Sequence, residues 1–348
     1  MIKIKDLCVD LGDFNLQDAT LEVREGEYFI ILGPTGAGKT VLLETIAGLY
    51  PAKSGRIWLN DIELTKVEPE KRGIAFVYQD YVLFPHLSVI DNITFGLRQR
   101  GVSKREARAE AQWLIELLGI SHLLKRKPDT LSGGEKQKVA LARALVVKPD
   151  VMLFDEPLSA LDPQTRDGVQ RELREIHDRL NLTTIHVTHD FEEAVSLGDR
   201  IAVIGDGRIL QVGTAEEVFR QPNSEFVARF AMTRNIFFGD VQRGDDDYAI
   251  IDVEGTQICV ITDLRGKRHA SVRPEDILLS TQPFLSSARN TFKGTITHVS
   301  SKGSTVYLSI NVPPEFVCLV TRHSYEEMDL REGGEAYVTF KASAVHVF

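Results

Sequence analysis

The stretch that decides the fold lies near the N-terminus and reads Gly33-Pro34-Thr35-Gly36-Ala37-Gly38-Lys39-Thr40. An apolar run at 28–32 precedes it and predicts a buried strand, and the apolar spacing of 41–47 is helical. A strand, a glycine-rich loop and a helix form the context in which this pattern binds phosphate. Its three glycines let backbone N–H groups turn toward an anion, where a Cβ would obstruct the approach.

Two residues at the end of this loop extend the prediction to the terminal phosphates of ATP. The ammonium of Lys39 can reach the β- and γ-phosphates, and the hydroxyl of Thr40 can ligate Mg²⁺. The following helix adds the partial positive charge of its N-terminus. The alternative is a glycine-rich turn with an ordinary surface lysine, but the flanking strand and helix favour a site for ATP and Mg²⁺.

A second glycine-bearing stretch, at 131–135, reads LSGGE and opens a helix that runs to residue 145. Ser132 is suited to cap this helix, and Gly133 and Gly134, followed by Glu135, leave its N-terminus bare. A phosphate could therefore contact the helix end directly. The alternative is a capped helix start without a ligand.

A pair of carboxylates follows an apolar run at 151–154, which has the pattern of a central parallel strand. Open α/β sheets bind ligands at the carboxyl ends of their strands, where Asp155 and Glu156 stand. We predict that Asp155 holds Mg²⁺, directly or through water, and that Glu156 is the general base for the attacking water. An exposed acidic turn is the alternative.

Taken together, residues 1–229 resemble the ABC-type ATPases, most specifically through LSGGE and the KQKVALARAL that follows it. The resemblance implies an α/β P-loop NTPase fold with a helical subdomain at about 85–135. It also implies that Gln79 senses Mg²⁺ and the lytic water, and that His189 contacts the γ-phosphate. His186, on the preceding strand, is interpreted as structural.

The resemblance further implies a homodimer, because in this family the signature of one subunit covers the γ-phosphate held by the other. Asp162 lies in a stretch that resembles the loop crossing that interface. These ATPases usually stack an aromatic ring on adenine. Leu11 stands here where an aromatic often does, so Phe14 is the candidate ring, unless it belongs to the core.

The stretch at 80–89 carries apolar residues ahead of a helical segment at 104–118. A small helical subdomain with its own core is one interpretation. In ABC importers this region receives a helix of the membrane subunit, which would make Tyr81, Phe84 and Pro85 docking contacts. No apolar stretch approaches the length of a membrane span, so transport would need a separate integral-membrane permease dimer.

Composition bounds the remaining possibilities. A chain of 348 residues is long enough for two domains, and its net charge of -9 argues against a nucleic-acid surface. Cys8, Cys259 and Cys318 are few and their spacing suggests no pairing, which favours a reducing cytosol. We therefore expect a peripheral protein on the cytoplasmic face of the cell membrane.

From residue 230 onward the pattern changes to short strands and turns, which predicts an all-β domain at 230–348. SARNTFKG at 287–294 and FKASAV at 340–345 resemble the opening and closing strands of molybdate-binding (Mop/TOBE) barrels of the OB-like type. A tetrahedral dianion needs neutral donors plus cations. The resemblance offers Ser287, Arg289, Thr321, Lys341 and Ser343. The alternative is a barrel without a ligand, as in importers of sugars and polyamines.

These observations predict the ATP-hydrolysing subunit of a molybdate/tungstate importer, regulated by the same oxyanions inside the cell. An extracytoplasmic oxyanion-binding protein would complete the transporter. Sulfate import and sugar import are the nearest alternatives. A soluble ABC ATPase without a permease is the alternative from another class. Molybdate and tungstate nearly coincide in size and charge, so the sequence does not separate them.

Overall fold

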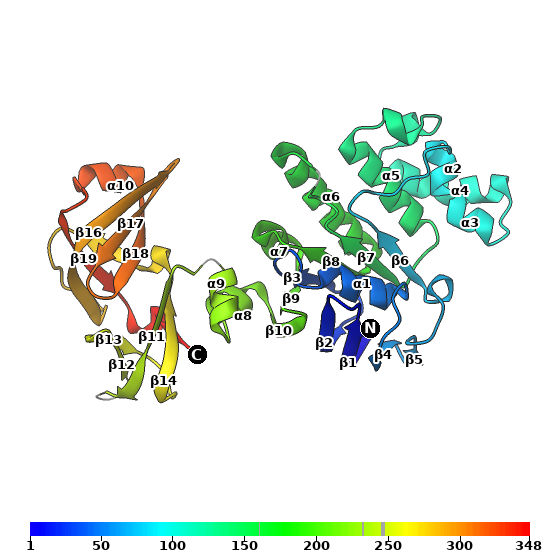
Figure 1. Cartoon of the computed structure of the whole chain (residues 1–348). Coiled ribbons are helices and arrows are strands. Elements are labelled where there is room, and N and C mark those ends of the chain that lie inside the picture. The colour runs from blue at the N-terminus through cyan, green and yellow to red at the C-terminus, as the bar shows by residue number, and fades with distance from the viewer. Residues whose placement is uncertain (160, 232, 245–247) are drawn as a thin grey trace. The chain divides into compact units, whose positions relative to one another are not determined.

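A computed structural model describes residues 1–159, 161–231, 233–244 and 248–348 (Figure 1). The chain divides into two compact units, Met1–Ala215 and Glu216–Phe348. The sequence placed this boundary at 229/230, after helices α8 (Ala215–Arg220) and α9 (Glu225–Phe230). In the structure this segment packs on the second unit, because Glu225 pairs with His269 at 3.3 Å and Nε2 of His346 donates to the carbonyl of Pro222.

The centre of the first unit is a six-stranded sheet in the order β10-β9-β3-β8-β7-β6. Strands β3, β8, β7, β6 and β9 are parallel, and β10 joins β9 in antiparallel fashion. Every residue of β3, β7 and β8 is buried, as expected for central strands covered on both faces. The strands are β3 (Tyr28–Leu32), β6 (Ile74–Val77), β7 (Val151–Asp155), β8 (Thr183–Thr188), β9 (Arg200–Gly205) and β10 (Arg208–Gly213).

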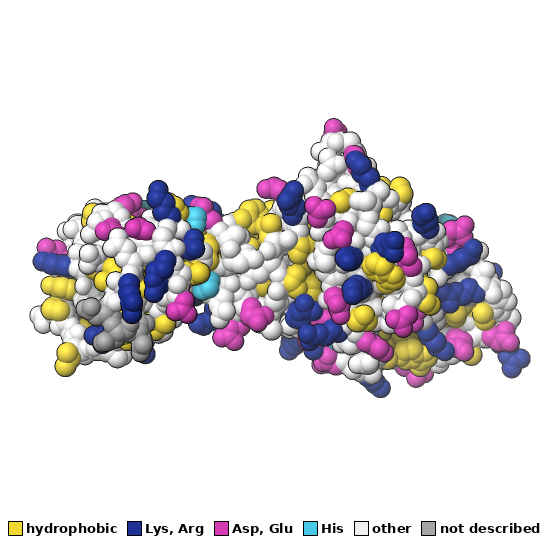
Figure 2. All heavy atoms as spheres, turned by 90° about the horizontal axis from the view of Figure 1, so that it is seen from below, with side chains coloured by type: hydrophobic (Ala, Val, Ile, Leu, Met, Phe, Trp, Pro, Cys, Tyr) yellow, Lys and Arg dark blue, Asp and Glu magenta, His cyan; other side chains and the backbone are white. Residues whose placement is uncertain are grey.

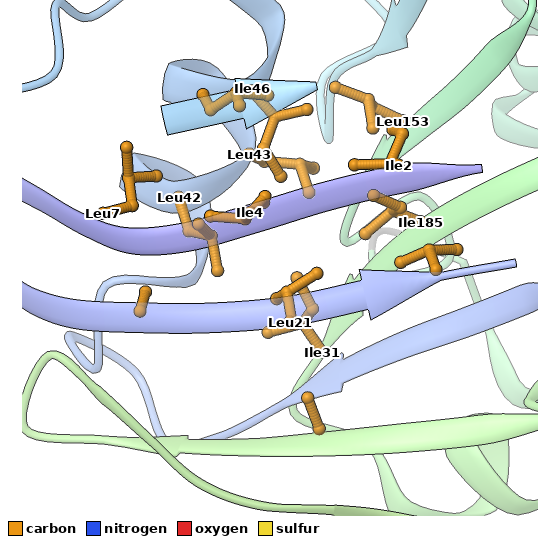
Figure 3. Packing of buried hydrophobic residues seen from close by; sticks show 14 of the residues in the cluster. Ile2, Ile4, Leu7, Leu21, Ile31, Leu42, Leu43, Ile46, Leu153 and Ile185 are labelled. Carbon is orange, nitrogen blue, oxygen red and sulfur yellow. The ribbon is translucent and has the colours of Figure 1, made fainter. Parts of the chain in front are cut away.

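A second, antiparallel sheet covers helix α1 (Lys39–Ala47) with the order β2-β1-β4-β5. Figure 3 shows Ile4 of this sheet, Leu43 of α1 and Ile185 of the parallel sheet meeting in one apolar core. That core fixes the position of α1, whose N-terminus forms the end of the glycine-rich loop. The strands are β1 (Ile2–Asp10), β2 (Asn15–Val23), β4 (Ser54–Leu59) and β5 (Ile62–Glu63).

Helices occupy the region at about 85–135 for which a helical subdomain is predicted, and the helix that LSGGE opens follows them. Ser103 caps α4 (Lys104–Leu117) in a capping box with Glu106. Ser132 caps α5 (Gly133–Leu145) in a capping box with Glu135. The helices are α2 (Val89–Ile93), α3 (Phe95–Gln99), α4 (Lys104–Leu117) and α5 (Gly133–Leu145). Short 3-10 turns lie at Pro69–Lys71, Ser121–Leu123 and Pro128–Thr130, and two further helices, α6 (Pro163–Leu180) and α7 (Phe191–Leu197), complete the unit.

The second unit contains two five-stranded antiparallel sheets, in the orders β13-β12-β11-β14-β20 and β15-β19-β16-β17-β18. Phe237, Phe316 and Phe340 lie in a single core that both sheets share, which confirms the predicted all-β, barrel-like class. The strands are β11 (Asn235–Arg243), β12 (Ala249–Val253), β13 (Thr256–Val260), β14 (Gly266–Val272), β15 (Leu278–Ser280), β16 (Asn290–Lys302), β17 (Thr305–Asn311), β18 (Glu315–Thr321), β19 (Glu335–Phe340) and β20 (His346–Val347). Helix α10 (Arg322–Glu327) follows β18, and 3-10 turns lie at Pro274–Asp276 and Ala342–Ala344.

Two surface properties bear on function. None of the helices in the described part of the chain is long and apolar enough to cross a membrane. On the face shown in Figure 2, basic and acidic side chains of the first unit are interspersed. Binding of a phosphate chain by this acidic protein therefore depends on local N–H geometry and a few placed cations rather than on a broad positive field.

Candidate nucleotide site

The glycine-rich loop connects β3 to α1 and has the backbone that its glycines predict. Gly36 and Gly38 have φ of 83° and 99°, in the left-handed region that glycine adopts without strain. A Cβ on Gly38 would lie 2.3 Å from Cζ of Phe14. Inside the loop, the N–H of Ala37 donates to the carbonyl of Pro34 at 3.2 Å. Any side chain at Gly38 would therefore displace the aromatic ring that packs on the loop.

A cavity of about 580 Å³ brings together residues that are far apart in the sequence. It lies at the carboxyl ends of β3 and β7, where open α/β sheets bind ligands. Its lining consists of Phe14, Thr35, Gly36, Gly38, Lys39, Thr40, Val41, Gln79, Asp155 and Glu156. Phe14 thus lines the cavity and also packs against the core, and its stacking on adenine stays a prediction.

The ammonium of Lys39 is buried and has oxygen partners on several sides. Its Nζ donates to the carbonyl oxygens of Gly33 and Pro34 at 3.0 and 3.1 Å, and it lies 3.4 Å from Oε1 of Glu156. Only 5% of the side chain is exposed. Phosphate oxygens at this point would offer the same cation stronger, charge-assisted hydrogen bonds than carbonyl oxygens do.

The residues predicted to hold Mg²⁺ are adjacent in space. The Thr40 hydroxyl lies 3.0 and 3.1 Å from the two carboxylate oxygens of Asp155. Burial raises the pKa of Asp155, and the hydrogen bond from Thr40 lowers it in part. A hydroxyl and a carboxylate that converge beside a phosphate site suit Mg²⁺, which takes oxygen ligands. Gln79 lines the same cavity and completes the predicted set.

Glu156 lies between Lys39 and His189, the histidine that is predicted to contact the γ-phosphate. Nδ1 of His189 lies 3.0 Å from Oε2 of Glu156, while Oε1 faces Lys39. The Glu156 backbone has φ of 44° and its N–H donates to the carbonyl of Val187. A non-glycine residue in this region is strained, and such strain concentrates at functional sites. The strand β8 therefore fixes where the carboxylate points.

A buried polar network under His189 was missed by the sequence analysis. The Thr188 hydroxyl donates to Oε2 of Glu193 at 2.6 Å and accepts from the N–H of Asp190 at 3.0 Å. Asp190 in turn caps α7 and pairs with Arg166 at 3.2 Å. These contacts fix Thr188 and Asp190, the residues on either side of His189. The loop that carries the histidine is therefore held in place.

The same network reaches the centre of the sheet. His186 is fully buried, as predicted, with Nδ1 3.0 Å from the Tyr28 hydroxyl and Nε2 3.5 Å from Oε2 of Glu193. Burial raises the pKa of Tyr28 far above its usual value, so its hydroxyl remains a donor. The sequence carried a weak signal of this network, namely a histidine, a threonine and a tyrosine on otherwise apolar central strands.

The signature residues, Ser132 to Glu135, do not belong to the described residues that line the nucleotide cavity. Ser132 caps α5, and its own N–H donates to Oε2 of Glu135 at 2.7 Å. A Cβ on Gly133 would meet Leu161, and one on Gly134 would meet Thr165. Among the described residues, none of the signature lines the nucleotide cavity. Asp162 caps α6 by accepting from the N–H of Thr165 at 3.1 Å.

The predicted docking stretch is only partly exposed. Tyr81 is wrong as a docking contact, because it is 4% exposed and its hydroxyl points to the carbonyl of Pro157. Phe84 is half-buried and Pro85 is exposed. Buried Asn92 donates to the Phe84 carbonyl and accepts from its N–H, so the position of this segment is fixed.

The structure separates the predicted oxyanion residues. Asn290 pairs with Phe340, which places Arg289 beside Lys341 at one end of β16, with exposed Ser287 in the preceding loop. Thr321 instead lies at the other end of β16, because it pairs with Thr305 of β17, which pairs with Lys302 of β16. There Thr321 caps α10. Ser343 lines a different cavity. Within one chain these five residues form no common site.

Comparison with known proteins identifies the class that this fold and site define. The family model described as ABC transporter matches residues 16–159, and the model of the TOBE domain matches residues 286–347. The molybdate/tungstate import ATP-binding protein WtpC of Pyrococcus abyssi is 46% identical, with 100% of each chain covered. This chain therefore belongs to the ATP-binding proteins of the ABC transporter family.

Other relatives and solved structures agree with this assignment. WtpC of Thermococcus kodakarensis is 49% identical over 85% of this chain and 88% of its own. The sulfate/thiosulfate import ATP-binding protein CysA of Xylella fastidiosa is 43% identical, with 81% of each covered. A dimeric ATP-binding cassette, MJ0796, bound to ADP and Pi after hydrolysis, has a TM-score of 0.55 at 28% identity and covers 62% of this chain and 99% of its own.

Proposed function

We propose that this chain is the ATP-hydrolysing subunit of a molybdate/tungstate importer. The observation that carries the proposal is the position of Glu156, which lies at the phosphate cavity between Lys39 and His189. The full-length relatives named for molybdate/tungstate import support the choice of cargo. Import would draw its free energy from hydrolysis at this carboxylate.

The residues of the site divide the work of hydrolysis. The loop N–H groups and Lys39 bind the phosphate chain, and Glu156 accepts the proton of the attacking water. His189 holds Oε2 of Glu156 and thereby orients the carboxylate. Thr40, Asp155 and Gln79 would hold Mg²⁺, which neutralises the charge that develops on the phosphates.

The signature requires a second copy of the chain. Among the described residues that line the nucleotide cavity of the same chain, none belongs to the signature. We propose a homodimer in which the signature of each copy, Ser132 to Glu135, covers the ATP of the other, with Asp162 near the interface. The dimeric cassette neighbour supports a dimer.

A permease dimer would dock beside the segment that precedes α2. A shallow cavity of about 210 Å³ lies there, lined by His86, Leu87, Phe95, Arg98 and Gln99. The guanidinium of Arg143, on the signature helix, donates to the carbonyls of Tyr81 and Val82 at 2.9 and 2.8 Å. Movement of the signature helix would therefore move the docking segment. This arrangement places the protein peripherally at the cytoplasmic face of the membrane, opposite an extracytoplasmic oxyanion-binding protein.

The test is reconstitution in vesicles with a permease dimer and an oxyanion-binding protein of a molybdate/tungstate importer. Vesicles with ATP inside should accumulate radiolabelled tungstate or molybdate, and vesicles with the Glu156→Gln subunit should not. Uptake by the Glu156→Gln transporter at the wild-type rate would contradict the proposal. Uptake of sulfate alone would keep the ATPase role and replace the cargo.

A further inference from the structure

Helix α6 lies against two other parts of the first unit. Glu172 of this helix pairs with Lys138 of the signature helix α5 at 2.8 Å. Arg166 of the same helix pairs with Asp190, which caps α7, at 3.2 Å. Helix α6 therefore connects the signature helix with the loop that carries His189.

The guanidinium of Arg166 forms hydrogen bonds to two loops at once. Its Nη1 donates to Oδ2 of Asp190 at 3.2 Å, and its Nη2 donates to the carbonyl of Leu161 at 3.2 Å. The side chain is only 28% exposed, so water competes little for these bonds. A guanidinium holds its donors in a rigid, planar fork, and the two bonds therefore set the position of one loop relative to the other.

The loop that contains Leu161 lies against the signature. A Cβ on Gly133 would lie 3.2 Å from Cδ2 of Leu161, and a Cβ on Gly134 would lie 3.6 Å from Cγ2 of Thr165 at the start of α6. The two segments are in close contact at these glycines. A displacement of the signature would therefore move Leu161, whose carbonyl is one of the two acceptors of Arg166.

The loop that contains Asp190 leads to the carboxylate that we propose as general base. Oδ1 of Asp190 accepts from the first N–H groups of α7, while Oδ2 accepts from Arg166. The next residue toward the N-terminus is His189, whose Nδ1 lies 3.0 Å from Oε2 of Glu156. One guanidinium thus connects the signature with the residue that orients Glu156.

The third donor of this guanidinium argues against a purely stabilising role. Nε of Arg166 is buried and has no hydrogen-bond partner among the residues that the structure describes. An unpaired buried donor on a charged group is unfavourable. The position of Arg166 is therefore better explained by what its two other donors hold in place.

We propose that Arg166 is a positioning residue for ATP hydrolysis, which keeps His189 and Glu156 aligned according to the position of the signature. The inference rests on the proposed function, because it takes Glu156 as the base and a homodimer as the active form. In that homodimer the signature covers the ATP of the other copy. Arg166 would then make the alignment of the base in one site depend on ATP bound in the other.

Steady-state ATP hydrolysis by the full-length chain tests this role. Arg166→Gln should lower kcat about tenfold, because a misplaced catalytic group reacts slowly, and it should leave ATP affinity, measured with a fluorescent analogue, unchanged. Arg166→Lys should recover little of the rate, because an ammonium keeps the charge but lacks the fork. Arg171→Gln, at an exposed position of α6, is the matched control and should hydrolyse ATP as the wild type does.

Asp190→Asn separates the bond to Arg166 from the helix cap, because asparagine caps helices about as well as aspartate does. This variant should lower kcat severalfold, and the double variant should be no slower than Arg166→Gln alone, since both changes break the same contact. Losses that multiply in the double variant would overturn the proposal, as would a wild-type rate in Arg166→Gln or in Arg166→Lys. If Arg166→Gln does not fold, Asp190→Asn decides alone, and a wild-type rate in it contradicts the proposal.

The proposed function fails or stands by a different measurement. If Glu156→Gln is inactive while Arg166→Gln hydrolyses ATP as the wild type does, only the role of Arg166 is wrong. If Glu156→Gln hydrolyses ATP at the wild-type rate, the proposed base is wrong, whatever the rate of Arg166→Gln.

Discussion

Nδ1 of His189 and Oε2 of Glu156 lie 3.0 Å apart, although they follow two different strands of the parallel sheet. The other oxygen of Glu156 faces Lys39 at 3.4 Å. One carboxylate is thus oriented from one side by the imidazole of His189 and from the other by the ammonium of Lys39. A bound γ-phosphate would compete for the lysine and release that oxygen toward water.

Replacing Glu156 by Gln should abolish turnover and preserve ATP binding. The amide keeps the shape of the side chain but cannot accept the proton, and positioned bases contribute about 10²–10⁴-fold. Steady-state phosphate release should fall by at least 100-fold, while the variant accumulates as an ATP-bound dimer by size exclusion. Glu192→Gln, an exposed carboxylate on α7, is the control. Substantial hydrolysis by the Glu156 variant would remove this residue from the role.

Glu193 is expected to act as a positioning residue for His189. Burial raises the pKa of Glu193, but hydrogen bonds from His186 and Thr188 outweigh it, so the carboxylate is ionised at neutral pH. Thr188→Val deletes one of these donors and should lower kcat about tenfold without changing ATP affinity. Thr188→Ser keeps the hydroxyl and should restore the rate. Equal losses in both variants would show that packing, not the hydrogen bond, matters at this position.

Asp155→Asn should weaken Mg²⁺-dependent nucleotide binding, because the ligand loses its charge while its shape stays. The measurement is fluorescence titration with an ATP analogue, with and without Mg²⁺. We expect a loss of at least tenfold with Mg²⁺ and little change without it. Thr40→Ser retains the second oxygen and serves as the control. An unchanged Mg²⁺ dependence in Asp155→Asn would place the metal elsewhere.

The same carboxylate should lower the stability of the ligand-free protein. Burial raises the pKa of Asp155, so the folded state holds the proton more tightly than the unfolded state does. Its contribution to stability is therefore greatest at low pH and is lost as pH rises through the raised pKa. At pH 7 without nucleotide, Asp155→Asn should melt at a higher temperature than the wild type, and the difference should shrink toward pH 4. A lower melting temperature at pH 7 would contradict this assignment.

Phe84→Ser should weaken assembly with the permease and leave basal ATP affinity intact. The ring packs on Phe95 at 4.5 Å, beside the cavity that we assign to docking, and it does not line the nucleotide cavity. Co-purification with the permease should drop severalfold. Trp113→Ser, at a 41% exposed position on α4, is the matched control. If both variants co-purify like the wild type, the docking surface lies elsewhere.

The sequence by itself located the candidate nucleotide site. A glycine with positive φ at Gly38, a lysine after it and two carboxylates after a fully apolar strand are local requirements, so they remain visible in a linear pattern. The class of each unit was likewise visible, because hydrophobic periodicity differs between buried parallel strands and short antiparallel ones.

Only the tertiary structure decided how distant polar residues meet. Tyr81 reads as an exposed apolar residue, yet its ring is buried and its hydroxyl reaches Pro157. Tyr28 and His186 look ordinary until the pairing of β3 with β8 brings them together. Thr321 and Arg289 were predicted for one oxyanion site but lie near opposite ends of β16. Such pairings depend on strand register and packing between distant segments, and no local pattern encodes them.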